Sequence, residues 1–187
     1  MVNNAGYGAF GAIEQMDDAA VEAQFDVNLF AALTVLRATL PALRASAGRV
    51  IQISSFFSRL AVPGSGFYSA SKSPLQLISE ALALELAPAG VHVTSIHPGY
   101  FATEFLESTQ VVAPDDIYAG TVGTTLSEVT KKAWDDPNIV VEAVLNVVAH
   151  PAPPQHLAVG QDAVQAVRQA LQHQLDELAE WEEYSWS

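Results

Sequence analysis

Residues Arg49–Lys72 read RVIQISSFFSRLAVPGSGFYSASK, and this stretch decides the predicted fold. Its first five residues form an apolar run that predicts a buried strand, Arg49–Ile53. A loop rich in glycine, proline and serine follows, and a helix is predicted from about Tyr68 to Leu86. Val91–Ile96 is nearly continuous in apolar content, which is typical of a parallel sheet covered on both faces. The pattern further predicts a helix at Asn138–Ala149 and a short strand at His156–Val159.

Three side chains of the quoted stretch have the chemistry of proton transfer. Lys72 follows Tyr68 by four residues, so a helix places the phenol and the ammonium on one face. A cation beside a phenol favours the phenolate, so we expect Lys72 to lower the pKa of Tyr68 from about 10. Ser55, just after the strand, is expected to hold a substrate oxygen against that phenol. On these residues alone, a solvated Tyr and Lys at a helix start stays an open alternative.

The spacing of these residues resembles the short-chain dehydrogenase/reductase family, and the likeness extends from Val2 to about Trp181. It implies an α/β fold, a Rossmann-like doubly wound parallel sheet in one domain, residues 1–187. Within the family, Asn-Asn-Ala-Gly-Tyr-Gly, Pro-Gly-Tyr-Phe and the late Trp-Glu-Glu segment look like 17β-hydroxysteroid and retinol dehydrogenases. The implied activity is the interconversion of a secondary alcohol and a ketone with NAD or NADP, NADP being favoured by the resemblance alone.

The resemblance assigns the catalytic roles. Tyr68 is expected to be the general acid or base for the substrate oxygen, and Ser55 to orient that oxygen. Lys72 is expected to tune Tyr68 and contact the ribose, and Asn28, which lies mid-helix, to hold a water linked to the lysine. On sequence alone Asn28 could equally be a solvent-facing helix residue. The cofactor-binding residues implied are Asn3, Asn4, Ala5, Gly6, Tyr68, Lys72, Pro98, Gly99 and Thr103.

The chain has no Gly-rich turn of the kind that cradles a pyrophosphate at a helix N-terminus. It thus matches only the family's fourth strand onward, with the flanking helices. We therefore expect a chain that is N-terminally truncated relative to the family, with an open sheet edge. The alternative function is a non-catalytic remnant that acts only as an interaction protein, because the glycine-rich half is missing.

Composition excludes several classes of function. The net charge is −13 and no basic stripe is present, so nucleic-acid binding is not expected. The chain has no cysteine, which excludes disulfides and thiolate sites, and its five histidines show no ligand spacing, so no metal is expected. We expect no apolar run to reach the length needed to span a membrane, and the predicted location is cytoplasmic.

Three further expectations concern the second half of the chain and its partners. Residues 104–133 are predicted to be a variable substrate lid whose apolar members suggest a small apolar alcohol or ketone. The resemblance implies a homodimer or homotetramer formed through the helices of Asn28 and Tyr68. In the last helix, a stripe at helical spacing is predicted to be core packing: Val164, Val167, Leu171, Leu175, Leu178 and Trp181.

Overall fold

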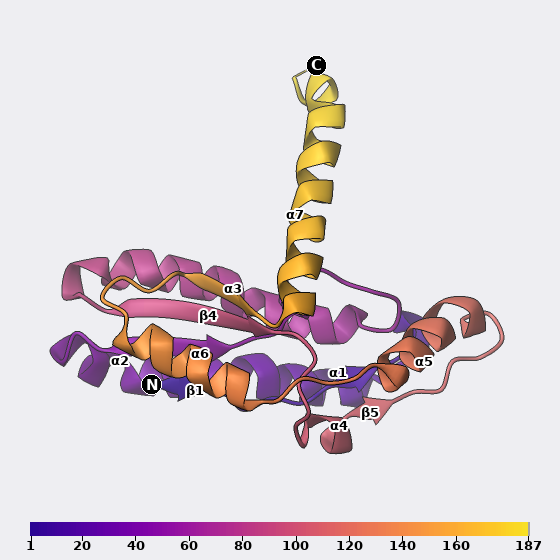
Figure 1. The fold of residues 1–187 in the computed structure, drawn as a ribbon, viewed down its shortest axis with the longest axis horizontal. Coiled ribbons are helices and arrows are strands. Elements are labelled where there is room, and N and C mark those ends of the chain that lie inside the picture. The colour runs from indigo at the N-terminus through magenta and orange to yellow at the C-terminus, as the bar shows by residue number, and fades with distance from the viewer. Residues whose placement is uncertain (187) are drawn as a thin grey trace.

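The computed structural model describes residues 1–186, and its centre is a parallel sheet with helices on both faces (Figure 1). The strand order is β1-β3-β4-β6, and each neighbouring pair is parallel. These strands are β1 (Val2–Asn3), β3 (Arg49–Ile53), β4 (His92–Pro98) and β6 (His156–Val159). The predicted strands β3 and β6 are confirmed to the residue, whereas β4 begins and ends slightly later than predicted.

Two helices cover one face of the sheet and a third covers the other. They are α2 (Ala32–Ala45) and α3 (Gly66–Leu86) on one face, and α6 (Asn138–Ala149) on the opposite face. Because neighbouring residues of a strand point to opposite faces, Val50 packs against α2 and α3 while Ile51 packs toward α6. The predicted doubly wound α/β arrangement is thus confirmed, as is the helix Asn138–Ala149.

β1 lies at the edge of the described sheet, where Val2 is half exposed. It pairs on one side with β3, through the register Val2 to Ile51. Within residues 1–186, no strand of this sheet pairs with the outer side of β1. The predicted open edge is therefore present in the structure.

A second, two-stranded sheet brings the predicted lid to the main sheet. β2 (Ala9–Phe10) pairs in parallel with β5 (Gln110–Val111), and the Gln110 amide donates to the Gly8 carbonyl at 2.9 Å. Around β5 lie α4 (Phe105–Ser108) and α5 (Thr124–Lys131). This pairing holds residues 104–133 beside the carboxyl ends of the main strands, as Figure 1 shows.

The helical stretch Asp18–Ala45 consists of α1 (Asp18–Phe25), a π-helical segment (Asp26–Ala31) and α2. By length and hydropathy it meets the criterion of a membrane-spanning helix, which core helices and signal sequences also meet. The expectation that no segment reaches that length is therefore wrong by this criterion. In this structure the stretch packs on the sheet and on α3, and the buried side of its centre carries Gln24 and Asn28. The cytoplasmic location stays a prediction.

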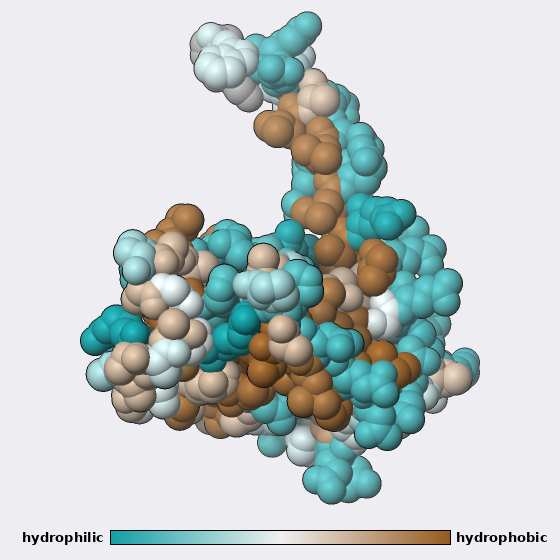
Figure 2. All heavy atoms as spheres, turned by 60° about the vertical axis from the view of Figure 1, so that its left-hand side comes forward, coloured by the Kyte–Doolittle hydropathy of each residue, from teal (hydrophilic) through white to brown (hydrophobic). Residues whose placement is uncertain are grey.

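The last helix, α7 (Gln161–Trp181), projects from the rest of the molecule (Figure 1). Only Ala163, in its first turn, is buried. Figure 2 shows apolar side chains along one side of this projecting helix, and Leu175 and Leu178 are 59% and 65% exposed. Val167 packs against the cluster of Phe56, Phe57 and Tyr68, but the prediction that the whole stripe packs in the core is wrong. After about two turns α7 leaves the sheet, and within residues 1–186 it meets no second layer.

Candidate active site

Three turns at the carboxyl ends of parallel strands meet at one cavity. They follow β1 at Asn4–Gly6, β3 at Ser54–Ser55 and β4 at Pro98–Gly99. Ligands of open α/β sheets bind at such ends. The cavity has a volume of about 800 Å³, within the range of small-molecule sites. The three turns therefore converge on one crevice at the carboxyl edge of the sheet.

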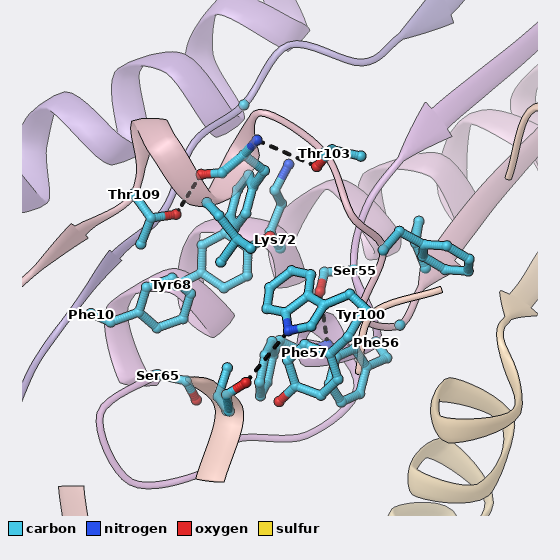
Figure 3. A pocket seen from close by; sticks show the side chains of 18 of the residues that line it. Phe10, Ser55, Phe56, Phe57, Ser65, Tyr68, Lys72, Tyr100, Thr103 and Thr109 are labelled. Atoms are coloured by element: carbon cyan, nitrogen blue, oxygen red, sulfur yellow. Dashed lines mark hydrogen bonds between the residues drawn. The ribbon is translucent and has the colours of Figure 1, made fainter. Parts of the chain in front are cut away.

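Tyr68 and Lys72 line the cavity from neighbouring turns of α3 (Figure 3). They are 5% and 4% exposed. The Tyr68 ring packs between segments distant in sequence: its centroid lies 4.9 Å from that of Phe10 and 5.7 Å from that of Phe105. The predicted common face of the two side chains is confirmed, and it is an enclosed, aromatic face.

Burial sets the titration of both groups. It raises the pKa of Tyr68 to about 12, and the hydrogen bond with the Ser55 side chain only partly opposes this. Burial also lowers the pKa of Lys72 to about 8. The prediction that Lys72 lowers the pKa of Tyr68 is wrong in this structure, because loss of hydration penalises phenolate and ammonium alike. At neutral pH Tyr68 is therefore a phenol and can donate a proton.

Ser55 is held by the short 3-10 turn Phe56–Ser58 that it caps. Its Oγ accepts from the Phe57 amide at 3.2 Å, and its carbonyl accepts from the Ser58 amide at 3.0 Å. The adjacent Ser54 amide donates to the Ile96 carbonyl of β4 at 2.8 Å. The end of the strand thus fixes the position of the serine next to Tyr68.

Asn28 joins the two sides of the site from behind the cavity. Its Oδ1 accepts from the Tyr7 amide at 3.1 Å, and its Nδ2 donates to the Tyr7 carbonyl at 2.9 Å. The same Nδ2 donates to Ser71 Oγ at 2.9 Å, and Ser71 Oγ donates to the Tyr68 carbonyl at 2.8 Å. Asn28 is 1% exposed and lies in the π-helical segment, so the solvent-facing alternative is wrong.

We expect Asn28→Ala to lower the free energy of unfolding by about 2 kcal/mol, because both backbone groups of Tyr7 and the Ser71 hydroxyl lose a buried partner. The measurement is urea unfolding followed by circular dichroism. Asn146→Ala is the matched control, since Asn146 is an exposed asparagine within a helix. Equal stabilities of the two variants would contradict this role of Asn28.

Most of the predicted cofactor residues lie together, and one does not. The cavity is lined by Asn4, Ala5, Gly6, Tyr68, Lys72, Pro98, Gly99 and Thr103. Asn3 is not among the lining residues: its Nδ2 donates to the Ala32 carbonyl at 3.1 Å and ties β1 to α2. Asn3 thus supports the sheet, whereas Asn4 of the same pair faces the cavity.

Sequence reasoning missed a wall of aromatic side chains in the cavity and the aspartate that holds it in place. Phe57 and Trp134 line the cavity with Tyr100, whose ring lies 5.3 Å from that of Trp134. Asp162, at the start of α7, accepts from the Tyr100 amide at 3.1 Å and pairs with Lys132 at 3.2 Å. No periodic pattern links these segments, although the two phenylalanines directly after Ser55 were a usable signal.

Comparison with known proteins gives consistent matches. Residues 1–111 match the family model described as short chain dehydrogenase. The chain is 32% identical over 190 residues to Oxidoreductase BOA17 of Botryotinia fuckeliana, covering 99% of this chain and 69% of that protein. It is 34% identical over 166 residues to 3-ketodihydrosphingosine reductase of Bacteroides thetaiotaomicron, covering 86% of this chain and 62% of that protein.

Solved structures match over almost the whole chain. A short-chain dehydrogenase from Streptomyces avermitilis has a TM-score of 0.91 and 35% identity, covering 98% of this chain and 68% of that one. A short chain dehydrogenase from Burkholderia cenocepacia, solved in complex with NADP, has a TM-score of 0.75 and 26% identity, covering 96% and 66%. This chain therefore spans about two thirds of the length of the proteins it matches.

Proposed function

Since the chain belongs to the short-chain dehydrogenase family, we propose that it reduces an apolar ketone to a secondary alcohol with a nicotinamide cofactor. One observation carries this proposal: the Tyr68 phenol, the Ser55 side chain and the Lys72 ammonium meet at one apolar cavity. The interconversion is reversible in principle. The protonated state of Tyr68 favours the reductive direction at neutral pH.

Tyr68 acts as the general acid in this proposal. With a pKa raised to about 12, the phenol carries its proton at neutral pH and donates it to the carbonyl oxygen as that oxygen gains charge. Ser55 Oγ offers a second hydrogen bond to the same oxygen and fixes its direction. Oxidation of an alcohol needs the phenolate instead, which burial disfavours.

The residues present fit the nicotinamide and ribose end of NAD or NADP, which supplies the hydride when bound. At Gly6, a Cβ would lie 2.7 Å from Lys72 Nζ, so only glycine leaves the backbone open beside the ammonium. Within residues 1–186 no carboxylate pairs with Lys72, so its donors are available to ribose hydroxyls. The NADP complex of the Burkholderia relative supports NADP as the first choice.

The cavity lining supports an apolar substrate. Aromatic rings pack around the Tyr68 ring, and the segment 104–133 adds Phe105, Leu106 and Val129 to the cavity lining. Burying apolar substrate surface against such a wall contributes about 25 cal/mol of binding free energy per Å². The similarity to a 3-ketodihydrosphingosine reductase is consistent with an apolar ketone. We assign the segment 104–133 as the lid over that substrate.

We further propose that two or four copies assemble through the helices of Asn28 and Tyr68. Phe30 and Val35, together with Leu77 and Leu84 of α3, are large apolar side chains that are 47% to 74% exposed. A homodimer or homotetramer would remove this surface from water. Analytical ultracentrifugation of the purified protein measures the state directly.

We expect NADPH to bind the 187-residue chain saturably at micromolar concentration. The measurement is a titration that follows nicotinamide fluorescence, run in parallel with NADH. Gly6→Val is the informative variant, because its side chain enters the space of Lys72 Nζ and Asn28 Oδ1 and should weaken binding at least tenfold. Gly120→Val is the matched control, since nothing lies within 4 Å of its Cβ. A chain that binds neither cofactor would favour the non-catalytic interaction protein.

A further inference from the structure

A line of polar side chains runs from the molecular surface to the backbone of Ser55. His97 of β4 is 2% exposed, and its Nδ1 lies 2.9 Å from Ser58 Oγ and 3.2 Å from the Ser55 carbonyl oxygen. Its Nε2 lies 3.3 Å from His156 Nδ1. The far nitrogen of His156 lies 3.1 Å from Glu80 Oε1, whose side chain is 36% exposed.

The carboxylate at the outer end fixes the tautomers of both neutral rings. An ionised carboxylate only accepts, so His156 carries its proton on Nε2 and presents the lone pair of Nδ1 to His97. His97 then carries its proton on Nε2, which leaves Nδ1 as an acceptor for the Ser58 hydroxyl. Gln76 donates to Glu80 Oε1 at 3.0 Å and holds the carboxylate in place.

Protonation of His156 reverses the direction of the hydrogen bond between His156 and His97. A protonated His156 donates from both nitrogens, and its Nδ1 proton can point only at a lone pair on His97 Nε2. His97 must then carry its proton on Nδ1 and donate to the Ser55 carbonyl, while the Ser58 hydroxyl donates to the same carbonyl oxygen, 2.7 Å away, instead of to His97. A proton taken up near the surface therefore changes a hydrogen bond at the turn that carries Ser55.

We propose that His97 is a positioning residue for Ser55, and that His156 and Glu80 determine from the surface which ring nitrogen of His97 carries the proton. The proposed function enters only through the role of Ser55. The charged groups that face the pair are Arg59, at the end of the 3-10 turn, and Glu80 on α3. Burial lowers the pKa of His97 to about 4 and also lowers that of His156, so both rings are neutral at pH 7.

The direct test is the ¹⁵N spectrum of the imidazole rings in the 187-residue chain, recorded from pH 8 downward. It needs neither cofactor nor turnover, so it stands if the proposed function fails. Single substitutions, His97→Asn and His156→Asn, assign the two rings. At pH 8 the signals should show the Nε2-protonated tautomer in both, and the His97 Nδ1 signal should shift in the same titration in which His156 gains its proton.

Glu80→Gln removes the charge but keeps an acceptor. It should lower the pH of the His156 titration by roughly half a unit, as expected for a partly exposed ion pair, and the His97 signal should move with it. Glu85→Gln, an exposed residue of the same helix, should change neither. A His97 ring that keeps one tautomer while His156 titrates would overturn the proposal, and so would an Nδ1-protonated His97 at pH 8.

A kinetic readout separates positioning from simple packing. His97→Leu should lower kcat about tenfold with little change in KM, because Ser55 loses its anchor. His97→Asn keeps a polar atom near the Nδ1 position and should restore most of kcat, but without the pH dependence that His156 imposes. Equal kcat values for the two variants would contradict the positioning role.

Discussion

Tyr68→Phe should lower ketone reduction about a thousandfold, the effect of removing a positioned general acid. The phenol is the buried donor beside Ser55, and phenylalanine keeps the ring contacts with Phe10 and Phe105 while removing only the hydroxyl. The measurement is the steady-state rate at which the purified protein oxidises NADPH with an apolar ketone in excess.

The matched control is Tyr100→Phe, which removes a second hydroxyl from the same cavity. Burial also raises the pKa of Tyr100 to about 12, with a contribution from Asp162, so its protonation state is that of Tyr68 at neutral pH. We expect near-normal turnover for this control and unchanged NADPH affinity for both variants. Turnover of Tyr68→Phe within threefold of the parent would remove Tyr68 from the reaction.

Lys72→Met should raise the free energy of unfolding by about 3 kcal/mol at pH 7 while abolishing activity. Lys72 is buried, and its pKa falls from 10.5 to about 8 through burial alone. The unfolded chain therefore binds more protons than the native one between pH 8 and 10.5, so native stability rises with pH across that window. Below pH 8 the cost of the buried ammonium is fully present.

Urea unfolding at pH 7 and at about pH 9.5 measures both parts of this prediction. The parent should gain stability between the two pH values, and Lys72→Met should lack this gain. Lys131→Met is the control, since Lys131 is exposed and its replacement should leave the stability and its pH dependence unchanged. A variant less stable than the parent at pH 7 would show that Lys72 has a stabilising partner.

Tyr68 and Lys72 lower the stability of the folded protein. A buried lysine that has no carboxylate partner within residues 1–186 and a tyrosine buried among aromatic rings are both poor choices for stability alone. Their retention at one cavity is best explained by chemistry that needs a donor and a cation near a bound molecule. Asn28 offsets part of that cost by tying Tyr7 and Ser71 together behind the site.

Local sequence determined the main elements of this protein. The apolar run Arg49–Ile53 forms a strand buried between two helical layers, because its side chains alternate toward both. The i to i+4 spacing put Tyr68 and Lys72 on one face, since helix geometry alone fixes that relation. The turns at Asn4, Ser55 and Pro98 converge because parallel strands bring their carboxyl ends to one edge.

Only the tertiary structure decided the properties that depend on distant segments. The pKa of Tyr68 rises rather than falls because Phe10 and Phe105, far apart in the chain, exclude water from it. The stripe of α7 has a perfect helical period, yet the helix leaves the sheet, so periodicity could not reveal what it contacts. The line from Glu80 to His97 likewise exists because β4, β6 and α3 pack together, and no local pattern specifies that packing.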